Sequence, residues 1–181
     1  MAPGAHLLIG WLSGACCLKQ TRERRVVALS GIAPDLDGLG LLVDQYTGTT
    51  SYYFQYHHYL GHSLFAAILF SAIAYACAKT QKALVSLLVF IVVHLHILAD
   101  IAGSKGPDGY QWPIYYLYPI NDLALTWQHQ WQLNAWQNHL FMLLLLIGCV
   151  LIFRLKNITF FEIFSKRLET HAIALFSRYK R

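Results

Sequence analysis

The sequence predicts an all-α protein that crosses a membrane several times, and three observations support this. Of its 181 residues, 56% are hydrophobic and 13% are charged, and the mean hydropathy is +0.42. The apolar residues form blocks without the polar alternation of barrel strands, which favours helices in lipid. The lysines and arginines gather at alternate ends of those blocks, as is typical of spanning helices. We therefore expect a single polytopic helical bundle.

Five apolar blocks define the expected crossings. They are residues 6–18, 26–43, 63–78, 83–101 and 139–153. The first is short for a full span, although tilt or local thinning of the bilayer can accommodate it. The second is interrupted by the segment 34–38, which contains a proline, two aspartates and a glycine. A proline there breaks helical hydrogen bonding.

The basic residues predict the orientation. Lys and Arg clusters follow the first, third and fifth blocks, whereas the segments after the second and fourth carry only Lys105. The positive-inside rule then puts the N-terminus outside and the C-terminus in the cytoplasm. This placement also argues against nucleic acid as a partner, although the formal net charge is +5. Membrane lipids are the expected partners.

Two flanking segments look interfacial. Residues 122–138 hold three tryptophans among glutamines, which predicts a Trp-rich helix in the outer headgroup belt. Residues 159–181 place Phe161, Phe164, Leu168 and Leu175 on one helical face with basic residues nearby, including Lys180 and Arg181. We expect this amphipathic helix to lie on the anionic cytoplasmic surface, or alternatively to bind a soluble partner. The chain thus divides into a membrane-embedded domain, 1–158, and a basic C-terminal helix, 159–181.

The four cysteines, Cys16, Cys17, Cys77 and Cys149, lie inside apolar blocks and form no C-x-x-C pair. We expect buried small hydrophobic residues here, not a disulfide framework or a zinc knuckle.

Imidazoles and carboxylates from four blocks converge at the expected outer leaflet. His96 and Asp100 are spaced i, i+4 and so share one helix face. If the third helix starts early, His58 and His62 also share a face; if it starts late, His57 folds back beside His62. The candidate ligands are His6, Asp35, Asp37, His57, His62, His96 and Asp100. Ionisable groups in spanning segments are functional by default, although any one of these could be a helix cap or an interfacial histidine.

A metal explains this set best. Several carboxylates in a low-dielectric region repel one another unless a cation holds them together. Mixed histidine and aspartate ligands suit zinc, or manganese or iron, better than calcium. Because the candidates outnumber the ligands of one tetrahedral ion, we expect one or two divalent ions.

The segment after the fourth block supplies candidates for substrate binding. Its glycines allow close backbone approach beside Ser104, and Lys105 is the lone base on this face. Trp112 begins an aromatic rim that covers the site or anchors the interface. The competing interpretation is a flexible loop with one solvated lysine.

Short motifs over residues 1–121 occur in a recognisable order: His6-Leu7-Leu8, Pro34-Asp35-Leu36-Asp37, His57 with His62-Ser63-Leu64, His96-Ile97-Leu98-Ala99-Asp100 and Trp112-Pro113-Ile114 with Tyr118-Pro119. In this combination the chain resembles the YdjM-type family of membrane-bound metal-dependent hydrolases, described as LexA-binding and inner-membrane-associated. The resemblance implies a metal site made of the seven candidate ligands. The family commonly has an arginine at the position of His58, which here either replaces a phosphate-contacting cation or joins the metal shell.

Together these features predict a metal-dependent hydrolase that opens to the non-cytoplasmic face. Asp37, as a general base through water, and His58 are the catalytic candidates. The depth of the site predicts an amphiphilic ester as substrate, such as a phospholipid or a lipid-linked phosphate. The alternatives are a metal transporter or sensor, and a structural membrane protein whose metal staples the helices.

Overall fold

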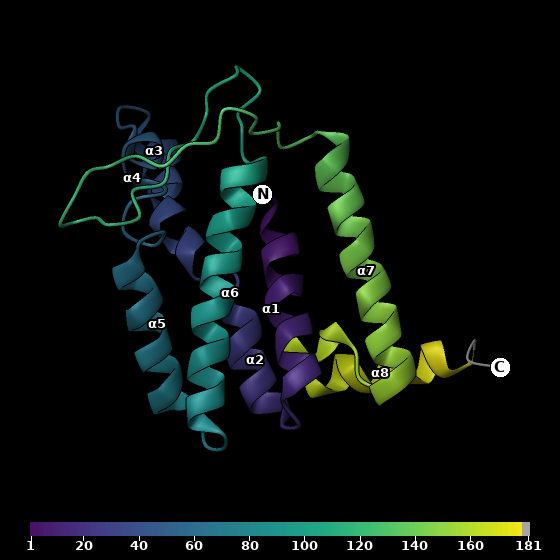
Figure 1. Ribbon diagram of the computed structural model, residues 1–181. Coiled ribbons are helices and arrows are strands. Elements are labelled where there is room, and N and C mark those ends of the chain that lie inside the picture. The colour runs from purple at the N-terminus through teal and green to yellow at the C-terminus, as the bar shows by residue number, and fades with distance from the viewer. Residues whose placement is uncertain (179–181) are drawn as a thin grey trace.

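The computed structural model describes residues 1–178 and is all-α over that range (Figure 1), as expected. Lys180 and Arg181 of the predicted basic tail lie outside the described residues. No strand occurs within 1–178, where two isolated bridges, Lys105 with Gln132 and Ile114 with Leu125, are the only β pairings. The helices are α1 Pro3–Cys17, α2 Thr21–Ser30, α3 Gly40–Thr47, α4 Tyr52–Tyr56, α5 Leu64–Cys77, α6 Lys82–Gly103, α7 Trp136–Lys156 and α8 Lys166–Ser177, with 3-10 turns η1 Pro34–Leu39 and η2 Phe160–Ile163.

The long helices stand side by side and run between two ends of the bundle (Figure 1). α6 packs against α5, α1 and α2, and α1 also packs against α7. Valines on one face of α6 form the centre of the core: Val85, Val89, Val92 and Val93 are fully buried. Because these positions recur every three or four residues, one stripe of the helix faces inward and the opposite stripe stays exposed.

The predicted break in the second apolar block is confirmed. α2 ends at Ser30, η1 begins at Pro34, and the two halves meet at a bend of 56°. Pro34 lacks a backbone donor and restricts the residue before it, which explains why the helix stops here. α2 begins at Thr21, inside the cationic run that precedes the second apolar block.

The predicted five crossings are not confirmed. Two helices, α6 and α7, are long and apolar enough to cross a membrane, and the bent pair 21–30 with 34–47 makes up to three. α1 has 15 residues and α5 has 14, which at 1.5 Å per residue gives about 22 Å, short of the roughly 30 Å of a hydrocarbon core.

The prediction of a Trp-rich interfacial helix over 122–138 is wrong. The chain is irregular between the end of α6 and the start of α7 at Trp136. Its backbone is instead paired with the end of α6: Trp131 N–H donates to the Ala102 carbonyl, and Lys105 N–H donates to the Trp131 carbonyl. These tertiary hydrogen bonds replace the helical ones that the glutamine-rich composition suggested.

The C-terminal segment contains an amphipathic helix, as expected, but the helix begins at Lys166 and not at residue 159. Phe161 and Phe164 lie before it, in and just after the 3-10 turn η2. α8 lies across the end of the bundle away from the N-terminus (Figure 1) and is capped by the Ser165 hydroxyl, which accepts from Leu168 N–H. Before it, Glu162 is buried and accepts hydrogen bonds from Arg24 Nε at 2.6 Å and from Trp11 Nε1 at 2.9 Å. The C-terminal segment is therefore tied to the ends of α1 and α2.

Within 1–178 the four cysteines are free, so the expectation of no disulfide is confirmed. Only Cys149 is buried; Cys16, Cys17 and Cys77 are exposed, so the prediction of burial was wrong for these three. Cys16 and Cys17 lie at the end of α1 and Cys77 at the end of α5, where the rest of the bundle does not cover their side chains.

Candidate metal centre

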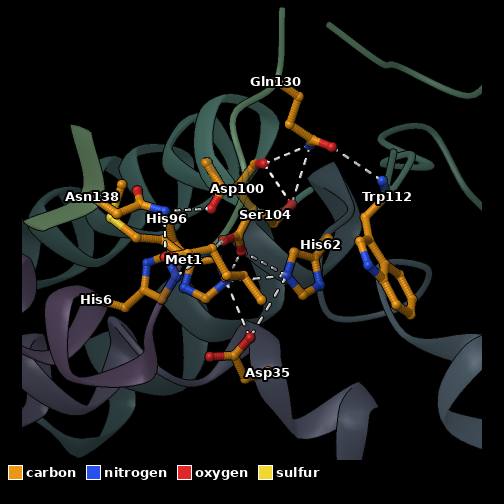
Figure 2. A network of polar contacts seen from close by, with 12 residues as sticks. Met1, His6, Asp35, His62, His96, Asp100, Ser104, Trp112, Gln130 and Asn138 are labelled. Atoms are coloured by element: carbon orange, nitrogen blue, oxygen red, sulfur yellow. Dashed lines mark hydrogen bonds and ion pairs between the residues drawn. The ribbon is translucent and has the colours of Figure 1, made fainter. Parts of the chain in front are cut away.

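The predicted ligands converge at the end of the bundle where α1 begins and α6 ends (Figure 2). His6 comes from α1, Asp35 from η1, and His96 and Asp100 from the last turns of α6. His62 lies just before α5, whose first residue is Leu64. The late start of α5 decides between the two sequence-based alternatives: His57 and His62 fold together around one partner, and His58 and His62 do not share a helix face.

Four side chains offer one ligand atom each within 4.8 Å of one another: Asp35, His62, His96 and Asp100. The His96 Nε2 lies 3.0 Å from His62 Nε2 and 3.0 Å from Asp100 Oδ2. Asp35 Oδ1 lies 3.5 Å from His96 Nε2 and 4.0 Å from His62 Nε2. The two histidines and Asp100 are buried, and Asp35 is partly exposed.

Hydrogen bonds on the far ring nitrogens determine which atoms face the centre. His96 Nδ1–H donates to the Gly31 carbonyl at 2.7 Å, and His62 Nδ1–H donates to Asp37 Oδ2 at 3.0 Å. The Nε2 lone pairs of both rings therefore point at each other. Two acceptors can approach to 3.0 Å only when a proton or a cation lies between them.

The pKa of His62 depends on its burial and on the neighbouring carboxylates. Burial alone would lower its pKa, but hydrogen bonds to Asp100 and Asp37 raise it to about 9. A proton on His62 thus satisfies the cluster in the absence of a cation. Because a metal ligand must be deprotonated, ion binding here releases that proton.

Asp37 belongs to a second group, with His57 and His62. Its Oδ1 lies 2.8 Å from His57 Nδ1, and its Oδ2 accepts from both His62 and the Gly61 N–H at 3.1 Å. Gly61 is needed for this approach, because a Cβ at that position would lie 2.1 Å from the Pro34 carbonyl oxygen. The geometry suits a carboxylate that orients a metal-binding histidine.

His6 lies beside the four ligands. Its ring stacks on His96 with centroids 3.7 Å apart, and its Nε2 is 3.2 Å from Asp100 Oδ1. Its Nδ1 is buried without a hydrogen-bond partner. The amino group of Met1 also contacts Asp100 Oδ1. His6 therefore contacts the cluster through Asp100.

His58 occupies a strained position between the two groups. Its φ is 75°, in the left-handed region that few non-glycine residues adopt, and its ring lies 4.3 Å from those of His57 and His62. Its Nδ1 is buried without a partner, and burial lowers the pKa of the imidazole well below its usual value. The side chain is therefore a neutral, unpaired hydrogen-bonding group.

A cavity of about 590 Å³ opens over the cluster. Its polar lining includes Asp35, Asp100, His57, His58 and Ser104, and its apolar lining includes Leu39, Leu41, Leu42, Leu133 and Trp112. Of the residues predicted to bind substrate, Ser104 and Trp112 thus line the cavity. Lys105 does not; its backbone pairs with Trp131 and Leu133.

The family model of the YdjM inner membrane protein matches residues 1–175. The chain belongs to this family. The match covers nearly the whole chain and includes each residue of the metal cluster. No curated protein and no solved structure matches the chain.

Gln130 is a residue of this YdjM family member that the sequence did not reveal. It is 3% exposed, and its amide donates to the Asp100 carbonyl at 2.9 Å and to Ser104 Oγ at 3.2 Å. Its carbonyl oxygen accepts from Trp112 N–H at 3.2 Å. Gln130 thereby holds the cavity loop on the end of α6 (Figure 2). A glutamine in a glutamine-rich stretch carries no signal of such a role.

Three other histidines lie outside the cluster: His129, His139 and His171. His94 also lies outside the two groups. It bonds the Phe90 carbonyl at 2.7 Å and the Tyr116 hydroxyl at 2.9 Å, so it links α6 to the loop that follows.

Asp37→Asn is predicted to weaken metal binding by about 10- to 100-fold, as is usual for loss of a carboxylate that orients a histidine ligand. The reason is that the amide leaves His62 free to rotate or to change tautomer. Isothermal titration of the purified YdjM family member with zinc would measure this. Asp122→Asn, an exposed aspartate on the same end, is the control. Equal zinc affinity in both variants would contradict the role of Asp37.

Proposed function

We propose that the protein is a metal-dependent hydrolase of an amphiphilic ester, such as a phospholipid or a lipid-linked phosphate. The single observation that carries the proposal is the pair of facing imidazole nitrogens, flanked by Asp35 and Asp100, at the base of a cavity. Four converging ligand atoms, two of them facing imidazole nitrogens that need a proton or a cation between them, are what a cation site requires.

The residues present fit a divalent transition metal. Two neutral imidazoles and two carboxylates match the ligand preferences of zinc, and also of manganese or iron. Asp35, His62, His96 and Asp100 would hold one ion; Asp37, His57 and His62 form a second group, in which Asp37 accepts hydrogen bonds from the two imidazoles. A bound ion of this kind supplies Lewis acidity and lowers the pKa of a water molecule.

The other polar side chains at the site have distinct roles. Asp37 has both oxygens engaged, by His57, His62 and Gly61, which favours an orienting role over that of general base. His58 lines the cavity with an unpaired nitrogen, so it is suited to hydrogen-bond a polar group of the substrate. The second oxygen of Asp35 is also unpaired. Both residues line the cavity.

The cavity lining favours an amphiphile. Its acidic and imidazole groups lie beside leucines of η1 and α3, and Leu39, Leu41 and Leu42 are exposed on the outside of the bundle. An ester with an apolar tail can bury that tail on the leucines while its polar bond meets the cluster. Trp112 and Tyr53 add aromatic walls.

The charge distribution supports a site at the non-cytoplasmic face. Within residues 1–178, the lysines and arginines other than Lys105 lie at the far end of the bundle, where α2, α6 and α8 begin and α7 ends. The positive-inside rule puts that end in the cytoplasm. A transporter would need polar groups through the interior, but the middle of α6 is a row of buried valines.

The test compares the wild type with Asp35→Ala/His62→Ala and with the control Asp122→Ala. Metal content is measured by elemental analysis, and turnover with a fluorogenic phospholipid in detergent micelles before and after chelation. We expect metal and chelator-sensitive turnover in the wild type and control only. Equal metal content in all three would remove the assignment of the ligands. Metal without turnover, combined with a lower melting temperature in the double variant, would favour the structural staple instead.

A further inference from the structure

The outward face of α7 carries two apolar grooves that meet at one arginine. One groove, of about 340 Å³, lies between α7 and the C-terminal segment, where Phe160 and Phe176 form its far wall. The other, of about 360 Å³, runs along α7 itself and includes Leu143, Ile147 and Leu151. Both are lined by Leu146, Val150 and Arg154. These three residues, which we call the α7 ridge, separate the grooves.

The ridge is aligned with the membrane. α7 is one of the two helices long and apolar enough to cross, and only 22% of its apolar window is buried in the protein. The grooves extend from Arg154, in the last turn of α7, back to Leu143. A rise of 1.5 Å per residue makes this about 16 Å, roughly half of the hydrocarbon thickness. The apolar part therefore reaches inward from the level of the headgroups.

Arg154 is available to an anion. Within residues 1–178 its side chain makes no hydrogen bond or ion pair, and it is exposed. The neighbouring Lys156 differs, because its amine donates to the carbonyls of Ala15 and Cys16. The carboxylates of the adjoining segment are also engaged: Glu162 by Arg24, and Glu169 by Thr159. Among the described residues, Glu162 is paired with the Arg24 guanidinium, Glu169 is held by the neutral Thr159, and neither forms an ion pair with Arg154.

We propose that the α7 ridge binds one anionic diacyl phospholipid, with an acyl chain in each groove and the phosphate on Arg154. Charge complementarity and the shared apex of the two grooves are the reasons for this occupant: a guanidinium pairs with phosphate oxygens in a two-pronged geometry. One acyl chain on each side of the α7 ridge explains why both grooves end at Arg154. The site lies at the opposite end of the bundle from the metal cluster and does not depend on the proposed hydrolase activity.

The test is native mass spectrometry of the full-length protein in detergent, titrated with phosphatidylglycerol or with phosphatidylcholine of the same acyl chains. We expect one retained phosphatidylglycerol, bound at least about tenfold more tightly than phosphatidylcholine. Arg154→Gln should remove that preference, and Val150→Trp should weaken both lipids by filling the grooves. Arg167→Gln, an exposed arginine of α8, and Leu140→Trp, at the other end of α7, are the matched controls and should leave binding unchanged.

Three results would overturn the proposal. The first is equal affinity for the two lipids in the wild type. The second is equal weakening by Arg154→Gln and Arg167→Gln, which would indicate diffuse surface charge. The third is a dimer that retains no lipid and that Val150→Trp dissociates, which would make a second copy the occupant. The melting temperatures of all variants are measured in parallel. Values within the wild-type range show that a loss of lipid binding does not result from a folding defect.

Discussion

Asp100→Asn is expected to strip the metal and to lower hydrolysis by more than about 100-fold, since loss of a mere orienting group already costs 10- to 100-fold. Asp100 is buried, and its Oδ2 lies 3.0 Å from His96 Nε2 and 3.5 Å from His62 Nε2, while its Oδ1 contacts His6. Among residues 1–178, no other carboxylate lies within 4.0 Å of three histidines. An amide has one neutral acceptor oxygen in place of a shared negative charge, so it cannot balance the cation.

Metal content and turnover of Asp100→Asn should be measured together, with Asp108→Asn as control. Asp108 is exposed on the following loop, where it accepts from Tyr110 N–H. If Asp100→Asn kept its metal and its turnover, the ligand set would have to be redrawn without α6. Added zinc at high concentration should restore part of the turnover if the defect is in affinity.

Glu162→Gln is expected to destabilise the protein by about 3–5 kcal/mol, the usual loss when one partner of a buried ion pair is removed. Arg24 and Glu162 are 4% and 2% exposed, and Arg24 Nε donates to Glu162 Oε1 at 2.6 Å. The neutral glutamine leaves the Arg24 charge buried without a counter-charge. Unfolding monitored by circular dichroism in detergent would measure the change, and Glu169→Gln, half-buried on α8, should lose far less.

The double variant Arg24→Met/Glu162→Leu separates the two origins of that loss. Because most of the penalty comes from the uncompensated charge and not from the missing attraction, the apolar pair should recover much of the stability. A double variant as unstable as Glu162→Gln would instead indicate that the hydrogen bonds from Trp11 and Arg24 carry the effect.

Much of the candidate site followed from the sequence, because intramembrane carboxylates and imidazoles are too costly to be scattered. The i, i+4 spacing of His96 and Asp100 placed both on one helix face, and the Pro34 break explained how Asp35 turns toward them. The sequence did not predict which of these residues are candidate ligands and which one orients a ligand. Asp37 lies next to Nδ1 of His62, whereas Asp35 lies on the side of its Nε2. This arrangement depends on the orientation of one imidazole ring, which the spacing of residues in the sequence does not determine.

Hydropathy correctly predicted which segments form apolar helices. It did not predict the features of the fold that depend on tertiary contacts. The apolar blocks correspond to helices, but hydropathy cannot distinguish a crossing helix from one of 14 or 15 residues such as α5 and α1. The segment before α7 has the composition of an interfacial helix, yet Trp131 pairs its backbone with Ala102 and Lys105. Gln130 was invisible for the same reason: its partners lie 26 and 30 residues away.

The buried valine stripe of α6 has a consequence for how the cluster would acquire its ion. Along α6, the buried stripe from Val85 to Val93 carries only apolar side chains, so this face of the helix offers a hydrated cation no ligand below the cluster. An ion would therefore enter and leave from the side of the cavity lined by Trp112. Occupancy would then follow the ion supply of the compartment that this side faces, and chelators confined to the opposite compartment would leave it untouched.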